Sequence, residues 1–359
     1  MKSWNRTKFT ELLGIEYPII QGPFGGGLSS VELTAMVSNT GGLGSFGGQP
    51  FSADELVETA HAIRSQTSKP FNINLWVEDR DPELIEFDAS SFHRWKNQFQ
   101  PYFEELKLPF PELPLDLGPR FEDQIEAIFE IRPSVFSFVY GIPSSDILEK
   151  CRKLGIRTIG AATNVEEAIA LENAGVDAIV ATGFEAGGHR VSFLRKPEES
   201  LMGTMSLIPQ VTDAVQVPVI AAGGIADARG IKASLILGAS GVQMGTAFLA
   251  TRQSNASKEH KELLFKSNGV DTTLTRVFSG RLARGLKNKL TDGLAGKNSI
   301  LAPYPLQGKL MGKLKNPDLS EKINQAFRSS WAGQSVSLLK HKDAAVLFSS
   351  LIREMGEFS

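Results

Sequence analysis

Short apolar runs that end in glycine alternate with helical patterns along most of this chain, an alternation typical of βα units around a parallel sheet. The apolar runs are residues 17–23, 42–47, 70–76, 135–141, 157–163, 177–183, 218–224 and 241–248. Several stretches between them begin with Ser, Asp or Asn and end in glycine, as helix caps require. Eight such units favour a closed barrel.

A doubly wound open sheet is the alternative to the barrel. Its glycine-rich turn should follow the first strand as GxGxxG, and QGPFGGG at residues 21–27 only loosely resembles that pattern. We therefore predict the α/β class, with a TIM (β/α)8 barrel, an insertion after strand 3 and an added, mainly helical C-terminal region.

Two segments do not fit the repeat. Residues 78–120 start with the acidic stretch EDRDPELIEFD and end in a proline-rich stretch. Their aromatic residues are Phe92, Trp95, Phe99, Tyr102 and Phe103. A solvated loop, a lid and a subunit contact all stay open for this insertion.

The second such segment, residues 276–315, holds nine basic residues and one acidic residue. It is either a solvated face or a region that attracts an anionic ligand. We predict a barrel over residues 1–275, including the insertion, and an added helical region over 276–359 that contributes to the active site.

Composition narrows the function classes. With 42% apolar residues in 359, the chain can bury a large core, and a net charge of −2 gives no global basic field for nucleic acid or an anionic membrane. No apolar run is long enough for a signal peptide or a bilayer span, so we expect a cytoplasmic protein without a membrane partner. The single cysteine, Cys151, cannot form an internal disulfide and reads as a packing residue.

Glycines end the seventh and eighth strands, where a barrel of this kind usually binds phosphate. Gly223 and Gly224 stand in AAGGIAD, and Gly245 precedes Thr246 in QMGTAF. Bare backbone there lets N–H groups point at an anion, assisted by the positive end of the helix that follows strand seven. Tight turns also need glycine, but the placement favours a phosphate carried by a cofactor or by a sugar.

The sixth strand runs into EAGGHR, where Gly187 and Gly188 precede His189. The glycines let a flat ligand lie against the backbone, and imidazole titrates near neutral pH. We predict a catalytic or substrate-binding role for His189 over a purely structural one. The other histidines, in helical or polar surroundings, are His61, His93, His260 and His341.

Motifs for other chemistries are missing from the sequence. It has no HxH, HExxH or cysteine pair for a metal, and no GxSxG for a serine nucleophile. The simplest remaining interpretation is that an organic cofactor carries out the chemical step and the protein binds that cofactor.

Several motifs together resemble the nitronate monooxygenases, formerly called 2-nitropropane dioxygenases. In chain order they are QGPFGGG, PFNINLW, GFEAGGHR, PVIAAGGIAD, GASGVQMGTAFL, FSGRLARGLKN, PYPLQ and WAGQS, and the likeness runs from about residue 10 to residue 336. The resemblance implies an FMN enzyme that oxidises alkyl nitronates, such as propionate 3-nitronate, or nitroalkanes with O2, giving a carbonyl compound and nitrite.

The resemblance also implies roles for individual residues, with His189 as the active-site histidine. Tyr304 and Trp331 would wall the substrate pocket from the added region. The residues implied to hold FMN are Gln21, Gly22, Pro23, Asn74, Thr182, Gly187, Gly223, Gly224, Gln243, Met244, Gly245 and Thr246.

The chain departs from the family pattern at two motif positions and in the length of the insertion, which leaves the subclass and substrate open. Thr182 stands where a glutamine is common, and Leu282 where a proline is usual. The alternatives are an NAD(P)H-dependent FMN reductase, like an enoyl-acyl-carrier-protein or quinone reductase, and a flavin-binding or phosphate-binding module without turnover. A homodimer is one assembly that stays open.

Overall fold

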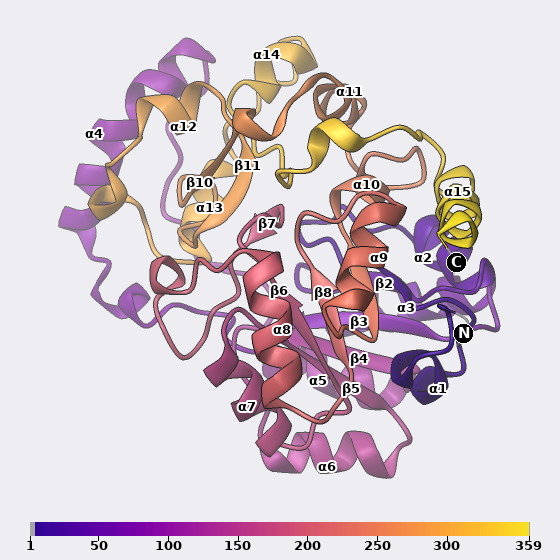
Figure 1. The fold of residues 1–359 in the computed structure, drawn as a ribbon. Helices are drawn as coiled ribbons and strands as arrows, with labels where there is room; N and C mark the ends of the chain where they lie inside the picture. The colour runs from indigo at the N-terminus through magenta and orange to yellow at the C-terminus, as the bar shows by residue number, and fades with distance from the viewer. Residues whose placement is uncertain (1–3, 359) are drawn as a thin grey trace.

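The computed structural model describes residues 4–358, and its centre is a ring of eight parallel strands (Figure 1). The strands are β1 (Ile19–Gln21), β2 (Gly44–Gly47), β3 (Phe71–Trp76), β4 (Val135–Val139), β5 (Arg157–Ala162), β6 (Ala178–Thr182), β8 (Val219–Ala222) and β9 (Gly241–Met244). They pair in the order β1-β9-β8-β6-β5-β4-β3-β2. Every predicted strand is present. The eighth ends at Met244, because Thr246–Leu249 forms the short helix α10.

The ring is closed between its first and second strands. Leu43 N donates to Ile19 O at 3.0 Å, and Gln21 N donates to Leu43 O at 3.0 Å. These bonds join the strands at the two ends of the pairing order, so the sheet has no open edge. The TIM barrel predicted from the sequence is confirmed, and the open doubly wound sheet is excluded.

Helices cover the outside of the barrel (Figure 1). Those expected from the sequence are α2 (Val31–Asn39), α3 (Ala53–Arg64), α5 (Phe121–Ile131), α6 (Ser145–Lys153), α7 (Val165–Asn173), α8 (Thr204–Ala214) and α9 (Ala228–Ile236). Side-chain caps start several of them. Ser52 Oγ accepts from Glu55 N while the Glu55 carboxylate accepts from Ser52 N, which satisfies two of the N–H groups at the start of α3. Ahead of the barrel lies the short helix α1 (Lys8–Leu13).

The last helix, α15 (Ala344–Glu357), packs against α2 and α9 and takes the place of the helix that follows the eighth strand. Phe348 from this helix is fully buried in the core between strands and helices. The predicted boundary at residue 275 stays a prediction. By packing, however, α15 joins the barrel although it lies at the far end of the sequence.

The insertion and the residues after 276 share a second hydrophobic core (Figure 1). We call the part of the molecule built around this core the cap. Its helices are α4 (Ala89–Glu105), α12 (Lys289–Gly293), α13 (Leu306–Met311) and α14 (Glu321–Gln325). Trp95 is fully buried there, and its Nε1 donates to Gln307 Oε1 at 2.8 Å. The aromatic residues of the insertion are therefore largely packed inside the cap, so the insertion is more than a solvated loop.

A small antiparallel sheet that the sequence did not predict joins the cap to the barrel. It consists of β10 (Thr272–Thr275), β11 (Ala283–Leu286) and β7 (Gly188–His189). In this sheet Ala283 pairs with His189, and Arg284 pairs with Gly188. The helix α11 (Lys258–Lys266) contacts α14. The segment after the sixth barrel strand is thus held as a strand by the cap.

Short 3-10 helices complete the described secondary structure, at Pro82–Glu86, Pro197–Glu199, Gly269–Asp271, Asn298–Ile300 and Val336–Leu338. Cys151 is buried in the main core, as the sequence predicted. Within residues 4–358, no helix combines the length and apolarity needed to cross a bilayer.

Candidate active site

A cavity of about 370 Å³ lies where the carboxyl ends of the barrel strands meet the cap, within the size range of cofactor and ligand sites. Residues predicted from the sequence that line it are Gly22, Pro23, Asn74, Thr182, Gly187, His189, Gly223, Gly224, Gln243, Gly245, Thr246, Tyr304 and Trp331. The barrel and the cap thus bring together residues that are spread over some 300 positions of sequence.

One side of this cavity is a turn of bare backbone after β8. Gly223 and Gly224 have φ values of +103° and +72°, a region that glycine enters at little cost. The N–H groups of Gly223, Gly224 and Ile225 donate to no other group within residues 4–358. Gly223 is half-buried, Gly224 is exposed, and all three residues line the cavity, so their unpaired N–H groups are available to an anionic ligand there.

The helix after this turn does not supply the free donors that the sequence suggested. Asp227 Oδ1 accepts from Arg229 N at 3.0 Å and from Gly230 N at 3.3 Å at the start of α9. The carboxylate therefore already occupies the positive end of that helix. Donors for an anion come from the turn itself.

Thr246 and Gly245, after β9, form the adjoining part of the wall. A Cβ atom added at Gly245 would meet nothing within 4 Å, so this position opens onto the cavity. Thr246 Oγ1 accepts from Gly333 N at 2.9 Å, which leaves the hydroxyl hydrogen free to donate. The WAGQS motif is therefore anchored beside the predicted phosphate site.

Gly187 is needed because two backbones pass close together. A Cβ atom there would lie 2.6 Å from Ala332 C and from Gly333 N, and Gln334 N donates to Glu185 O at 2.9 Å. From the sequence, we predicted that Gly187 lets a flat ligand lie against the backbone. In the structure, the approaching group is the cap backbone, although Gly187 also lines the cavity.

Two of the predicted cofactor residues do not line the cavity. Gln21 is fully buried, and its Oε1 accepts from Ser45 N at 3.0 Å. Met244 is fully buried in the core between strands and helices. Their side chains support the barrel, so any contact with a cofactor would have to come from their backbone atoms.

Among the polar residues that line the cavity, Asn74 has a free acceptor. Its Nδ2 donates to Ser137 Oγ at 2.9 Å, which leaves the amide oxygen for a ligand. Thr182 lies at the end of β6, where Arg190 fixes the strand. Arg190 is fully buried and donates to Gly183 O at 2.7 Å and to Thr182 O at 3.0 Å.

The His189 side chain projects from β7 and lies among aromatic rings. Its ring centroid lies 4.9 Å from that of Trp76 and 5.2 Å from that of Trp331, and its Nε2 is 2.8 Å from Ser279 Oγ. Burial, together with the positive charge of Arg281, lowers the pKa of His189 to about 3. The imidazole is therefore neutral near pH 7 and can use one nitrogen as a base and the other as a donor.

Ser279 connects the imidazole to the backbone of the cap. Its Oγ lies 3.2 Å from Arg281 O, to which it can donate, and it accepts from Arg281 N at 3.3 Å. When the hydroxyl donates to Arg281 O, the Nε2–H of His189 donates to Ser279. That arrangement leaves the Nδ1 lone pair free, because Nδ1 has no partner within residues 4–358.

Arg281 lies behind the aromatic wall, not in the cavity lining. Its guanidinium carbon sits 4.2 Å from the Tyr140 ring centroid and 4.3 Å from that of Tyr304, and its Nε donates to Asp81 Oδ1 at 2.8 Å. Trp76, Ser279 and Arg281 were not predicted as site residues. All three lie within the motifs PFNINLW and FSGRLARGLKN, but only folding brings these motifs to His189.

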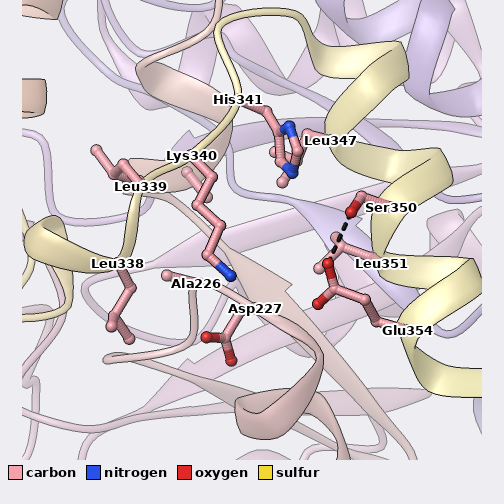
Figure 2. Close-up of a pocket in the computed structure, with 11 residues that line it drawn as sticks. Ala226, Asp227, Leu338, Leu339, Lys340, His341, Leu347, Ser350, Leu351 and Glu354 are labelled. Atoms are coloured by element: carbon pink, nitrogen blue, oxygen red, sulfur yellow. Dashed lines mark hydrogen bonds between the residues drawn. The ribbon is translucent and has the colours of Figure 1, made fainter. Parts of the chain in front are cut away.

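A second cavity, between α15 and the turn after β8, has a volume of about 10 Å³, so it has room for little more than one water molecule. Figure 2 shows Asp227, Lys340 and Glu354 among the side chains around it. None of the predicted site residues lines this space. The chemistry therefore belongs to the larger cavity.

Comparisons with known proteins agree with this geometry. A family model described as nitronate monooxygenase matches residues 6–354. A relative from Staphylococcus aureus (strain JH9), named probable nitronate monooxygenase, is 39% identical over 355 residues, which is 99% of this chain and 98% of that protein. The structure is similar to that of a nitroalkane oxidase from Streptomyces ansochromogenes, with a TM-score of 0.87, 31% identity and 98% coverage of each chain. It also resembles FabK from Thermotoga maritima, with a TM-score of 0.74, 27% identity and coverage of 98% of this chain and 97% of that one.

We expect the His189 imidazole to stay neutral at about pH 5, where a free histidine with its ordinary pKa near 6.5 is mostly protonated. The unfolded chain would take up a proton that the native state does not, so this residue lowers the free energy of unfolding as pH falls from 6.5 toward 3. NMR titration of protein with ¹³C-labelled histidine measures the pKa, and the spectrum of His189→Asn assigns the signal. A midpoint near 6.5 for that signal would contradict the expectation.

Proposed function

The chain belongs to the nitronate monooxygenase family, and on that premise we propose that it binds FMN in the large cavity and oxidises alkyl nitronates with O2. Nitroalkane and nitronate oxidation is the chemistry of the family, and the chain is an oxidoreductase. The single observation that carries the proposal is a titratable ring, His189, in the same cavity as a turn of unpaired backbone N–H groups.

The residues of the cavity fit FMN. The N–H groups of Gly223, Gly224 and Ile225, with the Thr246 hydroxyl, offer donors for the phosphate. Bare backbone at Gly245 leaves room beside a flat ring, and Gly22 lines the same cavity. Bound FMN would accept electrons from the substrate and pass them to O2, which is chemistry that amino-acid side chains do not supply.

The polypeptide would bind and orient the substrate and handle its proton. A nitronate is a delocalised anion. In the other tautomer of His189, in which Ser279 Oγ donates to Nε2, the Nδ1–H can donate a hydrogen bond to one of its oxygens. With a neutral nitroalkane, the imidazole can accept the α-proton at its free Nδ1 lone pair, although its lowered pKa makes it a weaker base than an ordinary histidine. Tyr304 and Trp331 from the cap would close the substrate side.

Propionate 3-nitronate is the example that the family resemblance implies, and FMN, O2 and an alkyl nitronate substrate all belong to the proposal. We expect yellow protein that consumes O2 and releases nitrite when a nitronate is added without NADH. Oxygen-electrode traces and a nitrite assay on the purified protein test this. Stopped-flow bleaching of the flavin by NADH or NADPH, without O2 uptake on nitronates, would instead favour the predicted alternative, an NAD(P)H-dependent FMN reductase.

Replacing His189 with Asn should lower turnover of neutral nitroalkanes by roughly a hundredfold or more, the usual contribution of a general base. Turnover of preformed nitronates should fall much less, because no α-proton has to be removed. FMN content, measured from the visible spectrum, should stay close to that of the unchanged protein. Normal turnover of every substrate by His189→Asn would show that the histidine has been given the wrong role.

Replacing Gly245 with Ala should weaken FMN binding by about tenfold or more, since a methyl group would enter the space beside the cofactor. The φ of Gly245 is −95°, so alanine brings no left-handed strain. Titration of apoprotein with FMN, followed by quenching of flavin fluorescence, gives the dissociation constant. Gly356→Ala is the matched control, because Gly356 also has nothing within 4 Å but lies exposed on α15. Equal affinity in the two variants would place FMN elsewhere.

A further inference from the structure

The part of the cavity around His189 is enclosed by aromatic rings. Trp76, Phe278, Tyr304 and Trp331 all line the cavity. Their ring centroids lie close to one another, at 5.1 Å between Trp76 and Tyr304 and 5.8 Å between Phe278 and Trp331. A substrate whose reacting end meets His189 must therefore place the rest of its chain against apolar surface.

No side chain that is charged at neutral pH lines this cavity in the described part of the chain. The only titratable side chains in its wall are His189, whose pKa is lowered to about 3, and Tyr304, whose pKa is raised by burial, so both are neutral. Near the imidazole, Gln49 donates to the Tyr304 hydroxyl, which leaves that hydroxyl hydrogen free, and Ser279 bonds to His189. A charged group on the substrate tail would find no ion-pair partner here.

Arg281 is a cation close to the aromatic part of the cavity, but it is not available as an ion-pair partner for the substrate tail. It forms an ion pair with Asp81, with the Nε and Oδ1 atoms 2.8 Å apart. Tyr140 and Tyr304 cover its guanidinium, and its side chain is 7% exposed. Its Nη1 is buried without a hydrogen-bond partner among the described residues.

We propose that this aromatic subsite, formed by Trp76, Phe278, Tyr304 and Trp331, receives an apolar substrate tail. The enzyme then selects nitronates with uncharged, hydrocarbon tails over nitronates that carry a carboxylate, such as propionate 3-nitronate. This inference rests on the proposed function and names the substrate class of the same site. Its physical basis is that burial of an unpaired carboxylate is unfavourable, whereas burial of methylene groups is favourable.

The test compares substrates of equal shape on the FMN-loaded enzyme. In 3-methylbutyl nitronate an isopropyl group replaces the carboxylate of propionate 3-nitronate, and the nitronate of methyl 3-nitropropanoate keeps the ester oxygens without the charge. We expect kcat/KM for 3-methylbutyl nitronate to exceed that for propionate 3-nitronate by roughly a hundredfold, with the ester in between. Along ethyl, propyl and butyl nitronates, kcat/KM should rise about fourfold per methylene until the subsite is full.

Binding supplies a second readout that does not depend on turnover. Calorimetric titration of the holoenzyme without O2 compares neutral 1-nitro-3-methylbutane with 3-nitropropanoate, whose carboxyl group is ionised at neutral pH. We expect the neutral compound to bind more tightly by at least tenfold. If no nitronate is oxidised, the proposed function fails, and these affinities still decide whether the subsite is apolar.

A charge placed in the subsite should reverse the preference. Trp331→Lys puts an ammonium group near the imidazole, and Trp331→Phe is the matched control for the loss of the indole. We expect the ratio of kcat/KM for propionate 3-nitronate to that for 3-methylbutyl nitronate to be at least tenfold higher in the lysine variant than in the phenylalanine variant. If the lysine variant does not fold, the comparison of substrates on the unchanged enzyme remains decisive.

Propionate 3-nitronate equal to or better than its isopropyl analogue, in both kcat/KM and affinity, would overturn the inference while leaving the proposed function intact. Arg281→Gln then identifies the reason. If this variant loses only the carboxylate substrate, Arg281 reaches the tail after all. Retention of that substrate by the variant would mean that uncharged donors in the wall are sufficient for the carboxylate.

Discussion

The pairing of β7 with β11 is the contact on which the site depends. Gly188 and His189 form a two-residue strand against Arg284 and Ala283, and this strand exists only because the cap supplies its partner. The backbone of His189 is thereby fixed, and Ser279 from the same part of the cap fixes its ring. The barrel contributes the glycine turns and the cap contributes the orientation of the imidazole, so neither part makes the site by itself.

Local patterns were sufficient to predict the barrel. Strand positions follow from apolar runs that end in glycine, and the caps of helices such as α3 depend on residues within one turn of each other. The glycine turns after β8 and β9 could also be predicted, because their position relative to the strands decides which cavity they face. For the same reason most of the predicted site residues do line one cavity, while their roles toward a cofactor stay predictions.

Features set by contacts distant in sequence could not be predicted in this way. The sequence does not reveal that Gly187 is required by Ala332 and Gly333, that Asp227 occupies the start of α9, or that α15 returns to the barrel. Trp76 and Arg281 meet His189 only after the barrel has closed and the cap has folded onto it. Gln21 shows that a residue inside a correctly predicted strand can still have its side chain on the side away from the cavity. Its neighbour Gly22 lines the cavity, but alternation along the strand turns the Gln21 side chain toward Ser45.

The electrostatics of the cavity follow from a wall without charged side chains. An anion near β8 would be held by the dipoles of backbone N–H groups, which are fixed in the fold and need no counter-ion. A positive charge does lie nearby, but the guanidinium of Arg281 is paired with Asp81 and covered by tyrosine rings, so it acts on His189 through space. Because burial and the charge of Arg281 both disfavour the imidazolium, the histidine keeps a lone pair at neutral pH beside a site for an anionic ligand, and the same lowering of its pKa makes it a weaker base. A cation exposed in the same wall would attract the anionic substrate but would also bind its carboxylate or the nitronate oxygens directly, and it would compete with the imidazole for the reacting end. Burying the charge behind aromatic rings avoids that competition and leaves apolar contact to determine which substrate tails are accepted.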